Sequence, residues 1–357
     1  MKKKAKASRS IKHVILKNIS NPISVHGIYP YRGKISPKDV ISVLSKLPSN
    51  KLLLDPFCGT GTILFEAVRA GNNVIGVDPN PLANIITRGK FNLKNLDREK
   101  TSNEIELIIK KAKLLKKSKK IPTEAQKGFH PKTAEQIMKV KEFYGDMSDY
   151  LKAIFCGTIA ISARGCNNYL WTSTTVGKDV YPKKYIDFYE KFQNKGKKHF
   201  FELENRTSKI YLKDARQLSK FIKPKSVDYV FTSPPYFDGL DYTAYYAKFV
   251  YSILEIDRIG VKKKLIQSLK SYEDDMQKCL NEIVKITKNN ALIIFVVGNK
   301  KIRNQEISGG DFFSAILRHK PNQIIERQYS DSASKVFDKI NKTNRKEQIV
   351  VWDKSTW

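Results

Sequence analysis

The sequence predicts an α/β fold: a doubly wound, seven-stranded, mostly parallel sheet interrupted by a helical insertion. Three observations support this prediction. Short apolar runs alternate with amphipathic stretches, glycine- and proline-rich turns follow several of the runs, and residues 92–207 break the alternation. Alternating strands and helices are typical of a parallel sheet covered by helices on both faces. The 357 residues fit one large domain with an insertion, or two domains that share a cleft.

The apolar runs are expected to be buried parallel strands because they are short, rich in aliphatic residues and bounded by turns: residues 51–55, 73–78, 210–214, 227–232 and 291–297. Residues 62–70 and 271–288 lie between them and show the apolar spacing of helices. Residues 323–329 and 347–353 predict two further strands that form a hairpin at one edge of the sheet. The two halves of the core are therefore expected at residues 1–91 and 208–357.

Residues 92–207 are predicted to form a mostly helical, strongly basic insertion, which is a candidate DNA-recognition region. The stretch contains a lysine-rich run at residues 110–120 and a more apolar helix at residues 148–163. Charge runs are usually solvated helix faces. The lysine-rich run is therefore expected to be either such a face or a DNA contact.

The charge balance favours nucleic acid as the partner. Lys and Arg number 66 against 35 Asp and Glu, a formal net charge of +31. A field of this sign attracts polyanions over long distances. Lysine far outnumbers arginine, so part of the excess can also reflect a generally lysine-rich composition.

The four cysteines form no C-x-x-C pair and no cluster with histidines, so no metal site is expected. They fit a reduced, intracellular protein. The basic N-terminus is not followed by an apolar signal core, and no apolar run has membrane-spanning length. The sequence thus predicts a soluble, cytoplasmic protein without membrane contact.

The first motif follows the first expected strand, where residues 55–62 read D-P-F-C-G-T-G-T. Gly59 and Gly61 allow the backbone to turn tightly and to approach a ligand closely. A G-x-G pair alone can be an ordinary turn between strand and helix. The flanking residues make a ligand-binding turn the favoured interpretation.

The second motif, G-V-D-P-N-P at residues 76–81, ends the next expected strand. Asp78 follows the glycines by about twenty residues, the distance at which a carboxylate commonly binds ribose hydroxyls. An alternative role for Asp78 is the N-cap of the following helix. The linked spacing of the two motifs favours cofactor binding.

The third motif, T-S-P-P-Y at residues 232–236, also follows a strand. Two consecutive prolines cannot continue a sheet because neither offers an N–H group. The chain is therefore expected to present the Ser233 hydroxyl, the Pro234 carbonyl and the Tyr236 ring to a cleft, although an ordinary Pro-Pro turn is the alternative. The oxygens can accept hydrogen bonds from an amino group, and the ring can stack on a base.

Together these segments resemble motifs I, II and IV of the amino-methylating DNA methyltransferases, in which Asp, Asn or Ser precedes Pro-Pro and an aromatic residue. Residues 26–34 resemble the segment of this family that contacts the methionine part of the cofactor, and residues 129–166 resemble the helical insertion of one subgroup. The resemblance implies a Rossmann-like class I methyltransferase fold. It also implies S-adenosylmethionine as cofactor and double-stranded DNA as partner.

The resemblance further assigns roles to individual residues. Asp55, Gly59 and Gly61 would hold the methionine part of the cofactor, Asp78 the ribose and Asp214 the adenine amino group, although Asp214 can also be only a cap at a strand end. The complete set of implied cofactor-binding residues is Tyr31, Arg32, Asp55, Phe57, Gly59, Gly61, Thr62, Asp78, Pro79 and Asp214. The implied catalytic residues are Ser233, Pro234, Pro235 and Tyr236.

The expected reaction is direct methyl transfer to a base that has rotated out of the duplex. Hydrogen bonds from the amino protons to Ser233 and to the Pro234 carbonyl would make the nitrogen more nucleophilic. No cysteine follows a proline, so Cys58 is not expected to attack the ring, as methylation of cytosine C5 would require. Tyr242 and Tyr245 either line the base pocket or pack in the core.

Several functions remain open at this point. Serine at position 233 resembles the cytosine-N4 branch, whereas the order of the motifs departs from the arrangement commonest there and keeps adenine N6 as the alternative. RNA guanine-N2 methylation and non-catalytic nucleic-acid binding are further alternatives. A cognate restriction endonuclease is a candidate partner of the proposed DNA methyltransferase.

Overall fold

The structure is a computed structural model that describes residues 23–31, 35–168, 182–235, 241–268, 270–302, 305–327 and 347–357. Its strands are β1 (Leu52–Asp55), β2 (Asn73–Val77), β3 (Ser208–Tyr211), β4 (Val227–Thr232), β5 (Thr287–Gly298), β6 (Lys300–Ile302), β7 (Gln305–Ile307), β8 (Gln323–Arg327) and β9 (Glu347–Asp353). The helices of the core are α1 (Pro37–Leu44), α2 (Thr62–Arg69), α3 (Pro81–Asn92), α9 (Ala247–Ile253), α10 (Arg258–Lys264), α11 (Tyr272–Ile286) and α12 (Gly309–Leu317).

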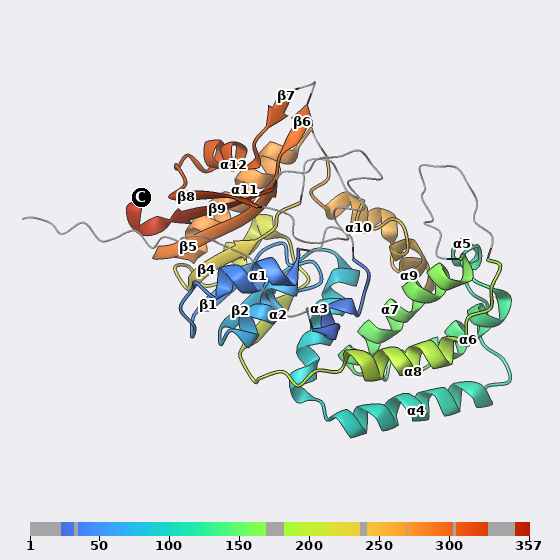
Figure 1. Ribbon diagram of the computed structural model, residues 1–357. Coiled ribbons are helices and arrows are strands. Elements are labelled where there is room, and N and C mark those ends of the chain that lie inside the picture. The colour runs from blue at the N-terminus through green and yellow to red at the C-terminus, as the bar shows by residue number, and fades with distance from the viewer. Residues whose placement is uncertain are drawn as a thin grey trace, which may run out of the picture.

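Seven of these strands form one sheet in the order β3-β2-β1-β4-β5-β9-β8 (Figure 1). The first five are parallel, and β9 pairs antiparallel with both β5 and β8. This arrangement confirms the expected doubly wound, mostly parallel sheet with a hairpin at one edge. β6 and β7 form a separate antiparallel pair.

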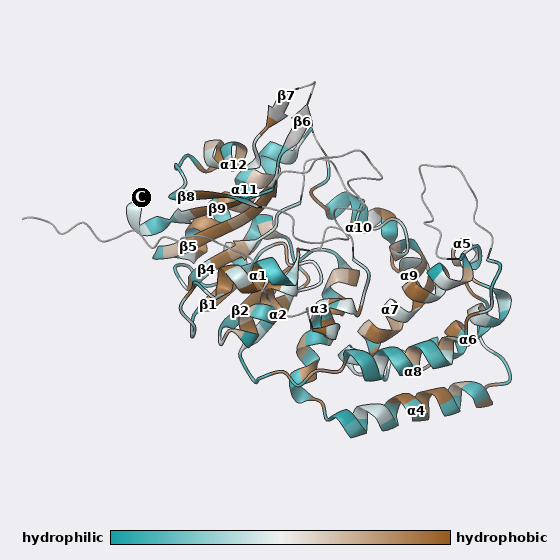
Figure 2. Cartoon of the chain, viewed as in Figure 1, coloured by the Kyte–Doolittle hydropathy of each residue, from teal (hydrophilic) through white to brown (hydrophobic). Residues whose placement is uncertain are grey.

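The central strands of the sheet are buried on both faces because they carry apolar residues at successive positions, whereas the edge strands β3 and β8 are partly exposed. In β5, Leu292, Ile294 and Val296 belong to one hydrophobic cluster, whereas Ile293, Phe295 and Val297 belong to another. Helices α1, α2 and α3 contribute to the first cluster, and α11 and α12 contribute to the second. Figure 2 shows these strands as predominantly hydrophobic.

The expected bounds of two strands were wrong. The third strand was predicted at residues 210–214, but β3 pairs with β2 only from Ser208 to Tyr211, because β2 itself ends at Val77. Asp214 therefore lies beyond the sheet, as the N-cap of the 3₁₀ helix η3 (Ala215–Lys220). β5 begins four residues before the predicted 291, at Thr287, where it pairs with Val227 at the start of β4.

Between α3 and β3 the chain forms the helices α4 (Arg98–Leu114), α5 (Thr123–Gln126), α6 (Pro131–Lys141), α7 (Asp149–Cys166) and α8 (Phe188–His199). Helix α7 packs closely on α3, since a Cβ on Gly89 would lie 2.4 Å from the Cβ of Ala153. The hydrophobic cluster on the α1–α3 face of the sheet continues without a break into α7 and α8. These helices thus share their core with the sheet and are not an independently packed lobe.

Helix α4 lies at the edge of the molecule opposite β8 and β9, with a largely hydrophilic outer face (Figures 1 and 2). It ends at Leu114, so only the first part of the lysine-rich run at residues 110–120 is helical. Among the described residues, no helix is both long and apolar enough to cross a membrane.

Candidate cofactor-binding and catalytic site

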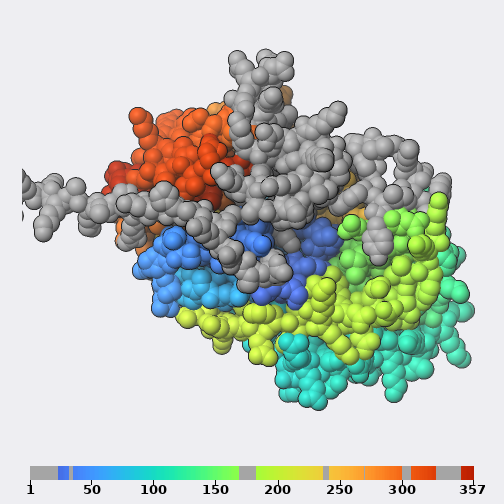
Figure 3. All heavy atoms as spheres, in the orientation of Figure 1, coloured from blue at the N-terminus to red at the C-terminus, as the bar shows by residue number. Residues whose placement is uncertain are grey.

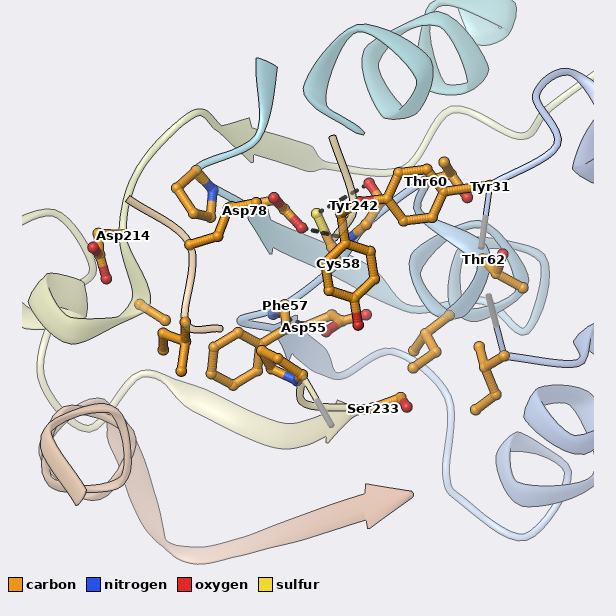
Figure 4. Close-up of a pocket in the computed structure, with 18 of the residues that line it drawn as sticks. Tyr31, Asp55, Phe57, Cys58, Thr60, Thr62, Asp78, Asp214, Ser233 and Tyr242 are labelled. Atoms are coloured by element: carbon orange, nitrogen blue, oxygen red, sulfur yellow. Dashed lines mark hydrogen bonds between the residues drawn. The ribbon is translucent and has the colours of Figure 1, made fainter. Parts of the chain in front are cut away.

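An open cavity lies beyond the carboxyl ends of β1, β2 and β4, where the order of the parallel sheet reverses (Figure 4). It is lined by residues of the three motifs and by neighbouring apolar side chains: Tyr31, Ile35, Asp55, Phe57, Cys58, Gly59, Thr60, Thr62, Ile63, Asp78, Pro79, Asp214, Ala215, Ser233, Pro235, Tyr242, Lys264, Leu265 and Ile266. The structure therefore brings together residues that are more than two hundred positions apart, from Tyr31 to Ile266.

The glycine loop after β1 turns sharply because Gly59 and Gly61 have φ angles of +48° and +71°. A side chain at Gly61 would collide with Thr87, whose Cγ2 would lie 2.7 Å from the added Cβ. Thr87 also donates a 2.8 Å hydrogen bond to the Gly59 carbonyl. The loop is thus fixed against α3, and its backbone faces the cavity.

Asp78 connects the first two motifs. Its carboxylate accepts hydrogen bonds from the Gly59 N–H and the Asn80 N–H, both at 2.9 Å, and the residue is 8% exposed. The side-chain cap of α3 is Asn80, which accepts from the N–H groups of Leu82 and Ala83. The alternative that Asp78 is merely the N-cap is therefore wrong, and its carboxylate lines the cavity.

Asp55 connects the glycine loop with the catalytic strand. The Thr232 hydroxyl donates a 2.6 Å hydrogen bond to Asp55, and the Phe57 N–H donates to the same carboxylate oxygen at 3.1 Å. Because Ser233 follows Thr232 directly, this contact fixes the start of the third motif beside the cavity. Asp55 and Ser233 both line the cavity, as Figure 4 shows.

The hydroxyl groups of Thr60 and Thr62 show whether the lining of the cavity suits a polar ligand such as S-adenosylmethionine. Both side chains are buried, both line the cavity, and neither hydroxyl has a hydrogen-bond partner among the residues that the structure describes. Buried hydroxyls are normally satisfied, so their position indicates a polar ligand. Thr62 also begins α2, whose first N–H groups favour a carboxylate such as that of the methionine part. The residues present fit the cofactor.

Tyr31 and Tyr242 form a nearly parallel pair in the cavity wall beside the glycine loop, with ring centroids 5.9 Å apart and an interplanar angle of 16°. Both also line a second cavity of about 350 Å³, together with Tyr29, Pro30, Asp241, Ala244, Tyr245, Tyr246 and Ala247. The backbone of Tyr245 has a φ of +57°, a conformation that is costly for a bulky residue. The tyrosines that follow the third motif thus line cavities, and Tyr246 is also buried in the core.

Asp214 lies at the edge of the cavity, as Figure 4 shows, but its carboxylate is already engaged. It accepts hydrogen bonds from the Arg216 backbone N–H and from the Arg216 guanidinium, which also pairs with Asp275. Asp214 therefore has a capping role in addition to lining the cavity. Its assignment to the adenine amino group stays a prediction.

The remaining predicted residues divide into three groups. Phe57 and Pro79 line the cavity, whereas Gly61 and the buried Pro234 are not among its lining residues. Arg32 and Tyr236 lie outside the described residues. The sequence interpretation missed the lining residues Ile35, Thr60, Ile63, Ala215, Lys264, Leu265 and Ile266. Of these, Ile35, Thr60, Ile63 and Ala215 lie in or next to a segment or residue that the sequence had indicated, whereas Lys264, Leu265 and Ile266 do not.

Burial gives the site a pH dependence. Desolvation raises the pKa of Asp55 to about 7, against hydrogen bonds from Thr232 and Phe57 that lower it. Desolvation likewise raises the pKa of Asp78 to about 6. Both carboxyl groups therefore take up protons as the pH falls from about 8 to about 5. The pKa values of Asp55 and Asp78 are higher in the folded state than in the unfolded chain. Protonation of the two groups at acid pH therefore stabilises the unliganded fold, and this stabilisation is lost as the pH rises through 6 to 7.

We expect S-adenosylmethionine to bind more tightly as the pH rises from about 5.5 to 7.5, because its sulfonium charge favours the ionised carboxylates. Isothermal titration calorimetry across this range measures the effect. S-adenosylhomocysteine, which lacks the sulfonium charge, is the matched ligand and should depend less on pH. Equal pH profiles for the two ligands, or a flat profile for S-adenosylmethionine, would contradict the expectation.

Burial also raises the pKa of the Cys58 thiol well above its usual value, so this side chain stays protonated in the cavity wall. All four cysteines are buried and unpaired. Among the residues that the structure describes, no group of His, Cys, Asp and Glu could hold a metal ion.

Known proteins with sequences similar to this chain are methyltransferases. A family model described as RMKL-like, methyltransferase domain, matches residues 39–125, which include the glycine loop and Asp78. The chain is 23% identical to the type II methyltransferase M.MjaII of Methanocaldococcus jannaschii, over 79% of this chain and 73% of that protein. It is 26% identical to the type II methyltransferase M.MvaI of Kocuria varians, over 56% of this chain and 49% of that protein.

Among solved structures, the chain is similar to the rRNA methyltransferase aviRa of Streptomyces viridochromogenes, with a TM-score of 0.40 and 12% identity over 97% of each chain. The sequence relatives, the matching methyltransferase model and the sheet order agree with the cavity described above. This chain is therefore an S-adenosylmethionine-dependent methyltransferase with a Rossmann-like fold, related in sequence to type II methyltransferases.

Proposed function

We propose that the enzyme transfers a methyl group to the exocyclic N4 of cytosine in a specific sequence of double-stranded DNA. The observation that carries this proposal is the position of Ser233, which lines the cofactor cavity at the end of β4. Two relatives named as type II methyltransferases and the net charge of +31 support a DNA substrate. A cognate restriction endonuclease and a cytoplasmic location are part of the same proposal.

The turn after β4 is well placed to orient an amino group. Thr232 is held by Asp55 from the side of β1, and the Pro235 carbonyl accepts a 2.5 Å hydrogen bond from the Tyr272 hydroxyl of α11. The turn is therefore anchored on both sides of Ser233. Anchored acceptors need little reorganisation when charge develops on the reacting group.

In the proposed mechanism the cofactor supplies a methyl group activated by its sulfonium charge. The Ser233 hydroxyl and the Pro234 carbonyl accept hydrogen bonds from the two amino protons of the base and direct the nitrogen lone pair at the methyl carbon. When bound, the cofactor would supply an electrophilic methyl group and leave as S-adenosylhomocysteine. The proton released from the methylated nitrogen would pass to solvent. Holding the two reactants in line accounts for much of the rate enhancement.

The target base must leave the duplex to reach this turn, at a cost of a few kcal/mol. The second cavity adjoins the first through Tyr31 and Tyr242, and its tyrosine rings offer faces on which a base can stack. Tyr242 and Tyr245 are therefore proposed to receive the rotated base. The protonated Cys58 thiol agrees with transfer to nitrogen without a covalent enzyme intermediate.

The test is to incubate the purified chain with methyl-labelled S-adenosylmethionine and unmethylated duplex DNA, and to identify the labelled nucleoside by mass spectrometry. We expect N4-methylcytosine, and its loss in the Ser233→Ala variant. Label in N6-methyladenine would keep the mechanism and replace the base. Label in RNA but not in DNA, or no label despite cofactor binding, would overturn the proposed substrate.

A further inference from the structure

The segment of residues 23–31 connects the helices α7 and α8 with the cofactor cavity. It begins with the 3₁₀ helix η1 (Ser24–Gly27) and ends at Tyr31, which lines both cavities. In Figure 3 the dark-blue atoms of this segment border the yellow-green atoms of the region that contains α8. The sequence interpretation assigned the overlapping residues 26–34 to the cofactor but gave no reason for their position.

Two buried polar side chains of α8 hold the segment. The Lys195 ammonium donates a 3.0 Å hydrogen bond to the Gly27 carbonyl, and His199 Nδ1 lies 2.5 Å from the Ser24 carbonyl. The two side chains also contact each other, with 3.4 Å between Lys195 Nζ and His199 Nε2. An ammonium can only donate, so Nε2 accepts and Nδ1 carries the proton that is donated to Ser24. Lys195 is 6% exposed and His199 5%.

The backbone of the segment fits closely between the insertion and the core. A Cβ on Gly157 of α7 would lie 1.9 Å from the Ile28 carbonyl oxygen, and a Cβ on Gly27 would lie 2.9 Å from His199 Cε1. On the opposite side, His26 Nε2 lies 2.6 Å from the Glu66 carboxylate of α2. The segment therefore has little freedom to shift while these contacts are intact.

Two short turns link the fixed residues Ser24–Gly27 to Tyr31. The Ile28 N–H donates to the Val25 carbonyl at 3.2 Å, and the Tyr31 N–H donates to the Tyr29 carbonyl at 2.9 Å. The Tyr31 ring lies beside the glycine loop, since its Cε1 would be 3.4 Å from a Cβ on Gly59. The position of the ring over the loop thus depends on the position of Gly27 and Ser24.

We propose that Lys195 and His199 are positioning residues for the cofactor: they hold residues 23–31 against α8 so that Tyr31 forms one wall of the cofactor cavity. Neither residue contacts the cavity itself. The proposal rests on cofactor binding in this cavity and does not depend on which base is methylated. The helices proposed to recognise DNA thereby also support the methyl-donor site.

The test is calorimetric titration of the full chain with S-adenosylmethionine, which needs no DNA substrate. Lys195→Met removes the ammonium and keeps the length of the side chain, and we expect roughly tenfold weaker binding, or about 1.4 kcal/mol. The matched control is Lys191→Met on the exposed face of the same helix, which should bind as the unchanged chain does. In methylation assays, the KM for the cofactor should rise while kcat at saturating cofactor changes less than about twofold.

A double-mutant cycle separates positioning from general stability. If Lys195 acts through Tyr31, then Lys195→Met should add almost nothing to the effect of Tyr31→Ala on the dissociation constant.

His199→Asn, whose amide can replace the Nδ1 donor, should bind the cofactor more tightly than His199→Leu. Should Lys195→Met fail to fold, Ser24→Ala removes only the 2.7 Å bond from the Ser24 hydroxyl to the Lys198 carbonyl and should weaken binding in the same direction. Unchanged affinity in folded variants, or additive effects in the cycle, would overturn the proposal.

Discussion

Asp78→Ala is expected to weaken S-adenosylmethionine binding roughly 100-fold, the loss of about two hydrogen bonds to a charged group. The Asp78 carboxylate is buried in the cavity wall and orders the glycine loop through the Gly59 N–H. Its remaining lone pairs are the proposed acceptors for the ribose hydroxyls. The substitution therefore removes ligand contacts and leaves the Gly59 N–H without its acceptor, and calorimetric titration measures the combined loss.

The matched control is Asp214→Ala. Asp214 also lines the cavity, but its carboxylate is occupied by Arg216, so its loss should weaken binding less than about tenfold. Circular dichroism of both variants would show whether the fold is retained. Equal losses for the two variants in folded protein would mean that Asp78 has no special role in ribose binding.

Ser233→Ala should lower kcat for methyl transfer by roughly 10²- to 10³-fold, the usual result of removing one preorganised group that stabilises the transition state. Thr232 directly precedes Ser233 in the sequence, and its hydrogen bond to Asp55 is retained in the Ser233→Ala variant. The turn should therefore stay in place, and the affinity of the variant for the cofactor should change less than about twofold. Single-turnover methylation of duplex DNA measures the chemical step.

Ser233→Asp provides the informative comparison for this second prediction. Aspartate keeps an acceptor at the same position, and the resulting motif resembles that of the adenine-N6 branch, so this variant should retain more activity than Ser233→Ala. A Ser233→Ala variant that methylates at the unchanged rate would remove Ser233 from the mechanism. That result would not contradict the proposed cofactor-binding residues.

The part of the site that could be predicted from sequence consists of residues that follow strands. Asp55, Asp78 and Ser233 come directly after, or within one residue of, the ends of β1, β2 and β4, and adjacent parallel strands place such residues at one edge of the sheet. Local patterns are sufficient for this inference. The hairpin of β8 and β9 was equally predictable, because both strands are short apolar runs separated by a polar loop.

Other residues reach the site through tertiary contacts that no local pattern encodes. Lys264 ends the short helix α10, and Leu265 and Ile266 follow it. The position of this helix depends on its packing, and nothing in the local sequence indicates a ligand. The pairing of Asp214 with Arg216 depends on the exit of the chain from β3, which ends earlier than expected. The contacts of Lys195 and His199 join residues more than 160 positions apart.

The position of β9 has a consequence for the synthesis of the protein. This strand is buried at every residue and lies between β5 and β8, so it separates two strands that precede it in the chain. While the ribosome is translating the first 346 residues, β8 has no neighbour in the sheet and β5 exposes one edge of its backbone. Unpaired apolar strands of this kind are prone to aggregation. β5 and β8 can therefore be joined only after residues 347–353 have been synthesised. A chaperone would protect the nascent chain most between the synthesis of β8 and the synthesis of β9.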